Sequence, residues 1–225
     1  MENVLSYKSA SDLNVAMGRV YANMGLAVVT SMIISMLVAS SPALMAVLFG
    51  TALKWVVIFA PLVAVFAFGY VLNSNPPKSL ALLMLHGFAA LMGLSFSTIF
   101  VVYNLGSIIS AFMGGAVLFG VAGAYGYFTK TNLEGFGKWL FVGLIGIVIA
   151  SIINIFVGSS VTQMVISAIA VIIFTGLTAY DNQRLREQLV TDNSVAAEVG
   201  GALSLYLNFI NIFLSLLQLF GEKKD

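Results

Sequence analysis

The stretch VIIFTGLTAYDNQRLREQ (residues 171–188) contains the transition that organises this chain. It opens with apolar residues, carries a single carboxylate at Asp181 and reaches its first cation at Arg184. Cations that follow a long apolar run are typical of the end of a membrane-spanning segment. Whether Asp181 is a surface residue or a buried residue with a function therefore depends on the class of the whole protein.

The composition of the chain indicates an integral membrane protein. Of its 225 residues, 60% are hydrophobic and 8% are charged, and the mean hydropathy is +1.03. Ordinary soluble domains carry roughly 25% charged residues. Seven apolar runs approach the ~20 residues that cross a bilayer as a helix. These runs predict an all-α bundle of seven transmembrane helices at 20–39, 53–73, 80–102, 107–128, 139–158, 161–181 and 202–220.

The predicted spans form one membrane domain at 20–220, between a cytoplasmic segment at 1–19 and a tail at 221–225. The opening residues are polar and lack the short apolar core of a signal peptide, so we expect the first span to remain in the mature protein. The longest predicted loop is 182–201. Cysteine is absent, which excludes disulfides and thiolate metal sites.

The distribution of Lys and Arg predicts the orientation, because short cytoplasmic loops are enriched in both. With a cytoplasmic N-terminus, Asp181 lies at the cytoplasmic end of the sixth span and the C-terminus lies outside. The cytoplasmic side then holds Lys8, Arg19, Lys78, Lys130, Lys138, Arg184 and Arg186, and the other side holds Lys54, Lys223 and Lys224.

The seventh span carries a polar face. Its members recur at steps of four, three, four and three, which places them on one side of a helix. They are Ser204, Asn208, Asn211, Ser215 and Gln218. We expect this face to point inward, away from lipid. It can line a path, or it can be interhelical hydrogen bonding worth ~1 kcal/mol per contact.

Two other spans carry distinctive residues. In the fourth, Gly120, Gly123 and Gly126 allow the close backbone approach that small residues give in membrane bundles. In the third, His86 is the only histidine of the chain. A metal site would need further ligands, so His86 is interpreted as a hydrogen-bonded bundle residue or as a proton sensor.

Asp181 is the candidate for function within the spans. Ionisable groups in membrane segments usually face the bundle or a water-filled cavity and mark an ion or substrate path, although a group near a span end can instead reach the headgroups. Thr178 lies one turn earlier on the same face. It can hydrogen-bond to the carboxylate or line the same cavity.

Four motifs of the spans stand out. They are ALMGLSFSTIFVVY (residues 90–103), GLIGIVIASIINIF (143–156), LTAYDNQRLRE (177–187) and ALSLYLNFINIFLSLLQLFG (202–221). Together they resemble the bacterial branch of the Bax inhibitor family, also called transmembrane Bax inhibitor motif proteins. The resemblance runs from about the second span to the C-terminus, with the motifs in the family's order and spacing.

The resemblance implies a bundle whose last helix lies near its centre and a calcium leak that is gated by pH. In the family, the Asp of the Tyr-Asp motif shares a proton with a second Asp in the last helix, in LYLDFIN. Asp181 matches the first position, whereas Asn208 occupies the second. The implied path residues are Asp181 and Asn208, with Thr178, Asn211 and Ser204 beside them.

The substitution at Asn208 alters the expected chemistry. Two close carboxylates cannot both ionise cheaply, so one pKa rises and the pair titrates near physiological pH. Asn208 supplies an amide donor that favours the charged form of Asp181, which weakens the shared-proton switch or moves it to lower pH. The second span also lacks the Arg that can hold the first Asp in the family.

The sequence thus predicts a non-enzymatic calcium-permeable leak in a bacterial inner membrane. Calcium is the permeant ion, binding transiently at Asp181, and no tightly bound cofactor is expected. The expected partners are the lipid bilayer and calcium ions, with no nucleic acid. One alternative is a non-conducting regulator of a membrane protease or of other membrane proteins. The other is an intramembrane aspartyl protease, which would need two carboxylates that share a proton.

Overall fold

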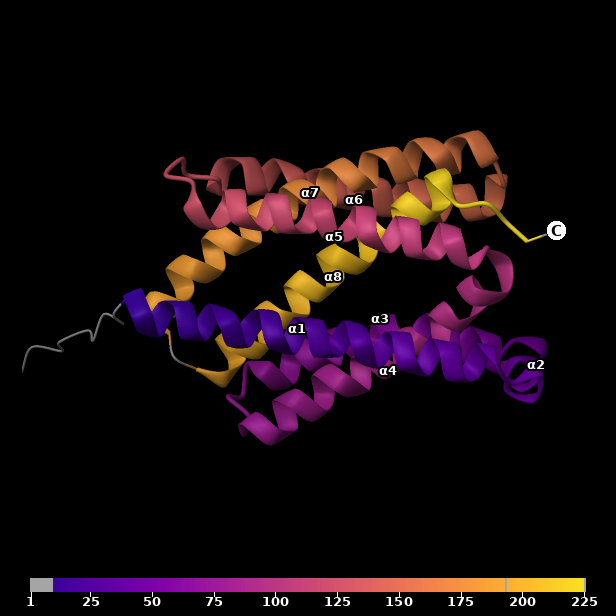
Figure 1. Cartoon of the computed structure of the whole chain (residues 1–225), viewed down its shortest axis with the longest axis horizontal. Coiled ribbons are helices and arrows are strands. Elements are labelled where there is room, and N and C mark those ends of the chain that lie inside the picture. Colours follow the sequence, from indigo (N-terminus) through magenta and orange to yellow (C-terminus); the bar gives the residue numbers. More distant parts are fainter. Residues whose placement is uncertain (1–9, 193, 225) are drawn as a thin grey trace, which may run out of the picture. The chain divides into compact units, whose positions relative to one another are not determined.

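The computed structural model describes residues 10–192 and 194–224. Within this part of the chain every regular element is helical, and there are eight helices (Figure 1). Their bounds are α1 Ala10–Ala39, α2 Pro42–Gly50, α3 Leu53–Leu72, α4 Lys78–Val102, α5 Leu105–Phe128, α6 Glu134–Val157, α7 Ser160–Thr191 and α8 Val195–Phe220.

Seven of these helices are long and apolar enough to cross a membrane, and only the short α2 is not. Large apolar side chains point outward from them, including Phe156, which is 86% exposed, and Trp139, which is 78% exposed. Such surfaces are unfavourable in water and suit contact with lipid. The prediction of an all-α membrane protein with seven spans is therefore confirmed.

The chain folds as two compact units that share the last helix. The first unit contains α1 to α4 and the segment Gln188–Tyr206, whereas the second contains Asn104–Glu187 and Leu207–Lys223. The helix α8 therefore belongs to both units. It is also the most buried span, with 56% of its most apolar window inside the protein against 11–39% for the others. The expected central position of the last helix stays a prediction.

The first unit is built on the packing of α1 along α4. A buried hydroxyl joins both helices to the first part of α8. Ser31 Oγ lies 2.7 Å from the carbonyl oxygen of Ala89 and 2.7 Å from the Tyr206 hydroxyl. The ring of Tyr206 also packs edge-on against Phe88. These contacts satisfy polar groups that would be costly in an apolar interior.

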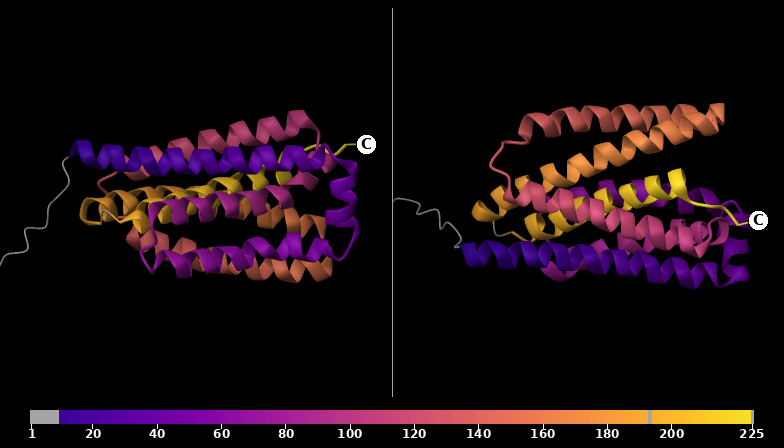
Figure 2. Two further views of the ribbon diagram at one scale, coloured as in Figure 1. Left: turned by 90° about the horizontal axis from the view of Figure 1, so that it is seen from below. Right: turned by 45° about the horizontal axis from the view of Figure 1, so that its top comes forward.

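In the second unit, α6 and α7 form a hairpin that the views of Figure 2 show as two helices joined by a tight turn. The turn contains Gly158 at φ +69°, a left-handed conformation that favours glycine at a helix end. Close to α7, a Cβ added to Gly126 would lie 1.9 Å from the carbonyl oxygen of Ala179. Close approach is thus confirmed at Gly126, whereas Gly120 is exposed with nothing within 4 Å of such a Cβ.

The connection between α5 and α6 is held by one side chain of α7. Gln183 Oε1 accepts a hydrogen bond of 2.8 Å from the backbone nitrogen of Leu133, and its Nε2 donates one of 2.8 Å to the carbonyl oxygen of Thr131. Gln183 is buried. A polar residue that follows the apolar run of α7 therefore has a structural partner inside the protein.

One predicted loop is wrong. The loop expected at 182–201 is mostly helical, since α7 continues to Thr191 and α8 begins at Val195. The cytoplasmic segment at 1–19 and the tail at 221–225 stay predictions. In the described part of the chain α1 begins at Ala10 and α8 ends at Phe220, while Lys8, the rest of 1–9 and Asp225 lie outside the described residues.

The helix α2 has no counterpart among the predicted elements, although its start carries standard signals. Ser41 occupies the N-cap position and its side chain accepts a hydrogen bond of 3.4 Å from the backbone nitrogen of Leu44. Pro42 follows as the first helical residue, where its missing N–H costs nothing.

Candidate functional site

The candidate site lies where α7 meets α8 within the second unit. Asn208 Nδ2 donates a hydrogen bond of 2.7 Å to Asp181 Oδ2. Asn208 is buried and Asp181 is half-buried. Residues far apart in sequence are thus brought into direct contact, as the resemblance implies. The donor is a neutral amide, so this contact joins the carboxylate to a dipole rather than to a cation.

Asp181 lies inside a helix rather than at its end. The helix α7 has 32 residues, which corresponds to a length of roughly 48 Å, whereas the hydrocarbon core of a bilayer is about 30 Å thick. A helix of this length extends beyond the lipid tails. The polar residues that follow Asp181 continue the helix and do not begin a loop.

Thr178 is fully buried, but its hydroxyl does not serve as the predicted donor to Asp181. It donates a hydrogen bond of 2.7 Å to the carbonyl oxygen of Phe174 instead. This is the usual bond of a hydroxyl to the preceding turn of its own helix. A role for Thr178 in lining the same path stays a prediction.

The polar face of α8 contacts α7 at a second point, nearer the end of α8 and nearer the start of α7. Gln218 Oε1 accepts hydrogen bonds of 2.7 Å from Ser167 Oγ and 2.8 Å from Gln163 Nε2. Asn211 instead donates to the carbonyl oxygen of Leu207 in its own helix, at 2.8 Å. Part of this face is therefore interhelical hydrogen bonding, one of the two interpretations drawn from the sequence.

The five residues of the polar face of α8 are not all buried, although the whole face was expected to point inward. Asn208 and Ser215 are buried, and Ser204 and Asn211 are half-buried, whereas Gln218 is exposed. Ser204 belongs to the first unit, and Asn208 and Asn211 belong to the second. Roles for Ser204 and Asn211 in an ion path stay predictions.

His86 lies in the first unit, where its Nδ1 is 2.9 Å from Thr30 Oγ1. The Thr30 hydroxyl also bonds to the carbonyl oxygen of Leu26 at 2.9 Å. Because a hydroxyl has one hydrogen, donation to Leu26 leaves the ring nitrogen of His86 as the donor to Thr30. This geometry fits the first of the two interpretations of His86, a histidine that is hydrogen-bonded to another helix of the bundle. The role of a proton sensor stays a prediction.

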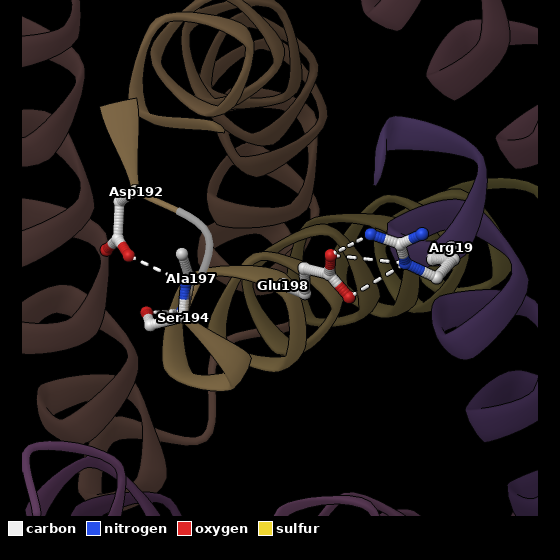
Figure 3. Close-up of polar contacts among 5 residues, drawn as sticks. All are labelled: Arg19, Asp192, Ser194, Ala197 and Glu198. Atoms are coloured by element: carbon white, nitrogen blue, oxygen red, sulfur yellow. Dashed lines mark hydrogen bonds and ion pairs between the residues drawn. The ribbon is translucent and has the colours of Figure 1, made fainter. Parts of the chain in front are cut away.

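An ion pair in the first unit was not anticipated from the sequence. Arg19 of α1 contacts Glu198 of α8 through several atoms (Figure 3), with its Nε 3.0 and 3.1 Å from the two carboxylate oxygens. Glu198 is buried, whereas the side chain of Arg19 is 43% exposed. Glu198 had been placed in the predicted loop, so no inward orientation was considered for it.

The start of α8 carries a signal that could have located Glu198 on a helix. The Oδ1 atom of Asp192 accepts a hydrogen bond of 2.7 Å from the backbone nitrogen of Ser194, and Ser194 Oγ accepts one of 3.1 Å from that of Ala197 (Figure 3). A serine in this position caps the first turn of a helix. Glu198 in the first turn is further favoured by the helix dipole.

No cluster of metal-ligating side chains accompanies Asp181. Across residues 10–192 and 194–224, no group of three or more His, Cys, Asp or Glu side chains lies together. High-affinity calcium sites use several oxygen ligands with more than one carboxylate.

The sequence was compared with known proteins. The sequence model described as "Inhibitor of apoptosis-promoting Bax1" matches residues 13–225. The inner membrane protein YbhL of Escherichia coli is 40% identical over 223 residues, covering 94% of this chain and 93% of YbhL. An uncharacterized membrane protein of Streptococcus pyogenes serotype M3 is 40% identical over 164 residues, covering 72% of this chain and 71% of that protein. An uncharacterized protein of Caulobacter vibrioides is 36% identical over 220 residues, covering 92% of this chain and 88% of that protein. With its seven spans, this multi-pass membrane protein belongs to the Bax inhibitor family.

Proposed function

We propose that this protein is a calcium-permeable leak of a bacterial inner membrane, with Asp181 as its cation site and Asn208 as the partner of Asp181. The observation that carries the proposal is the hydrogen bond of 2.7 Å between Asn208 Nδ2 and Asp181 Oδ2. It holds a carboxylate against the last span, where a family member would have two carboxylates. The inner membrane location follows the name of the relative YbhL.

The chemistry of this contact suits passage rather than storage of calcium. Calcium accepts carboxylate, amide and carbonyl oxygens as ligands, and Asp181 and Asn208 supply the first two. Conduction requires binding that is strong enough for entry and weak enough for exit. One carboxylate beside a neutral amide gives weaker attraction than two carboxylates, so we expect a leak of modest selectivity.

A non-conducting regulator of other membrane proteins is the second candidate. The contacts of α8 with α7 through Gln218, Ser167 and Gln163 favour it, because this part of the polar face is used for helix packing rather than for a path. An aspartyl protease has less support, since the neutral Asn208 contacts Asp181 where such chemistry needs a second carboxylate. We therefore propose no enzymatic activity.

Calcium flux separates a leak from a regulator. Purified protein should admit calcium into liposomes loaded with a calcium-sensitive dye, at a rate above that of empty liposomes and of liposomes that contain an unrelated seven-span protein. A rate equal to both controls would refute the leak and favour the regulator.

The proposed orientation places the N-terminus in the cytoplasm and the C-terminus outside, as the Lys and Arg distribution indicates. A reporter that is active only outside the cytoplasm should work when fused after Asp225 and fail when inserted near Asn193. The opposite pattern of activity would refute this orientation.

A further inference from the structure

The helix α3 contains a proline, Pro61, within its length. Proline has no backbone N–H, so it cannot make the helical hydrogen bond to the carbonyl oxygen four residues earlier. In α3 that oxygen belongs to Val57. A backbone carbonyl without a donor is costly inside a membrane, where water cannot replace the missing bond.

A side chain of α4 supplies the missing donor. Ser95 Oγ donates a hydrogen bond of 2.8 Å to the carbonyl oxygen of Val57. Ser97 and Thr98, which follow on α4, instead bond to carbonyl oxygens of α4 itself, at 2.7 and 3.1 Å. All of these residues belong to the first unit. Ser95 thus joins α4 to the carbonyl of α3 that Pro61 leaves free.

Val57 is also the point at which this part of the chain is buried. Of residues 42–60, all of which the structure describes, Val57 alone is buried, with 6% of its surface exposed. These residues comprise α2, the turn after it and the first part of α3. Beyond Pro61 the same helix buries Phe68 and Leu72. Segments with few buried contacts open more easily than well-buried ones, so Val57 is the main anchor of residues 42–60.

The anchor has a second position available to its donor. Ser95 Oγ also lies 3.4 Å from the carbonyl oxygen of Leu91, one turn earlier in α4. Serine hydroxyls in helices can bond to a carbonyl of this kind. A rotation of the Ser95 side chain would therefore exchange a bond with α3 for a bond within α4. Only the carbonyl of Val57 would then lose its donor, and this cost favours the closed arrangement.

We propose that residues 42–60 form a hinged flap, which turns about Pro61 and is latched to α4 by the hydrogen bond from Ser95 to Val57. A proline that interrupts the hydrogen bonds of a helix is a common point of bending. An open flap separates the first part of α3 from α4. The inference goes beyond the proposed function, because the flap moves in the same way whether or not the protein conducts calcium.

Hydrogen exchange of the purified protein in detergent tests the latch, read at the backbone amides of residues 53–60. Ser95→Ala should speed exchange there by about fivefold, the factor that accompanies the loss of one net hydrogen bond. In a Pro61→Ala background the same substitution should change exchange little, because residue 61 then has an N–H that can bond to Val57. Ser97→Ala is the matched control, since the Ser97 hydroxyl bonds within α4, and it should leave exchange at residues 53–60 unchanged.

Spin labels test the hinge. The chain has no cysteine, so a single label can be attached at Val56→Cys, within the flap, or at Val63→Cys, beyond Pro61. The two valines are similarly exposed, at 59% and 67%. The label at position 56 should be the more mobile, and Pro61→Ala should reduce its mobility to that of the label at position 63.

Two results would overturn the inference. If Ser95→Ala has no effect on exchange, or an equal effect in the parent and in the Pro61→Ala background, Ser95 is a packing contact without a link to Pro61. If the two labels are equally mobile in the parent, α3 does not bend at Pro61. Should Ser95→Ala lose its fold, the labels decide the matter, and a higher mobility at position 56 that Pro61→Ala removes supports the flap.

Discussion

Two carboxylates tie the last helix to its neighbours, and they do so in different ways. In the first unit, Glu198 of α8 contacts the guanidinium of Arg19 in α1. In the second, Asp181 of α7 contacts the amide of Asn208 in α8. The first contact joins opposite charges, whereas the second joins a charge to a neutral dipole.

We expect this difference to separate a structural role of Glu198 from the functional role that we propose for Asp181. At Glu198 the negative charge is compensated by a fixed cation, so little attraction remains for a mobile ion. At Asp181 the hydrogen bond orients the carboxylate without cancelling its charge, and charges of this kind in membrane segments usually mark ion or substrate paths. Loss of the first contact should thus affect stability, and loss of the second should affect flux.

The largest expected effect is on stability, from Arg19→Ala. It leaves the buried carboxylate of Glu198 without its cation, which should lower the free energy of unfolding by about 2 kcal/mol, less than for a fully buried pair because Arg19 is half exposed. Thermal unfolding in detergent should show a melting temperature lower by about 5 °C. Glu198→Gln should cost less, because glutamine can still accept a hydrogen bond from Arg19. Equal losses in the two variants would contradict this asymmetry.

The second effect is on flux, from Asp181→Asn. This variant keeps the volume and the hydrogen bonding of the side chain but removes its charge. Calcium flux should fall by about tenfold, which corresponds to roughly 1.4 kcal/mol of lost attraction, while the melting temperature should change little. Unchanged flux in a folded variant would mean that Asp181 only reaches toward the headgroups.

The third effect is a new dependence on pH, from Asn208→Asp. The parent has an amide opposite Asp181, so its flux should vary only weakly between about pH 6 and 8, the range in which a coupled carboxylate pair can titrate. The variant restores such a pair and should show flux that varies clearly over this range. Adding Asp181→Asn should remove the dependence again. If flux through the parent already depends on pH as strongly as flux through the variant, another group must be the pH sensor. His86 would be the first residue to test.

The smallest effect is expected from Lys138→Ala. It removes the ion pair in which Lys138 Nζ lies 2.8 Å from Glu134 Oε1 and both side chains are exposed. Exposed pairs one helical turn apart contribute little to stability. Its melting temperature should match that of the parent, so this variant is the control for Arg19→Ala. A loss as large as that of Arg19→Ala would show that burial of Glu198 is not the cause.

The number of spans and the contact of Asp181 with Asn208 could be predicted, because they depend on hydropathy and on motifs that resemble a known family. The helix ends could not. Hydropathy falls after Asp181, and this fall was interpreted as the end of the helix. The helix continues instead, and Asn182 and Gln183 remain helical and buried inside the protein.

Side-chain contacts between residues that are far apart in the chain also could not be predicted from the sequence. Arg19 and Glu198 are separated by 179 positions, and neither belongs to a motif that names the other.

The side chain of Gln183 has a practical consequence for engineering. Because it bonds to the backbone at both Thr131 and Leu133, the turn between α5 and α6 has a fixed length despite its exposed position. An epitope tag or a fluorescent protein inserted there would separate the two backbone groups to which the side-chain amide of Gln183 bonds. The buried Gln183 would then lose its hydrogen-bond partners. The tip of the hairpin between α3 and α4, where Ser74 and Asn75 are exposed, is the better site for such a label.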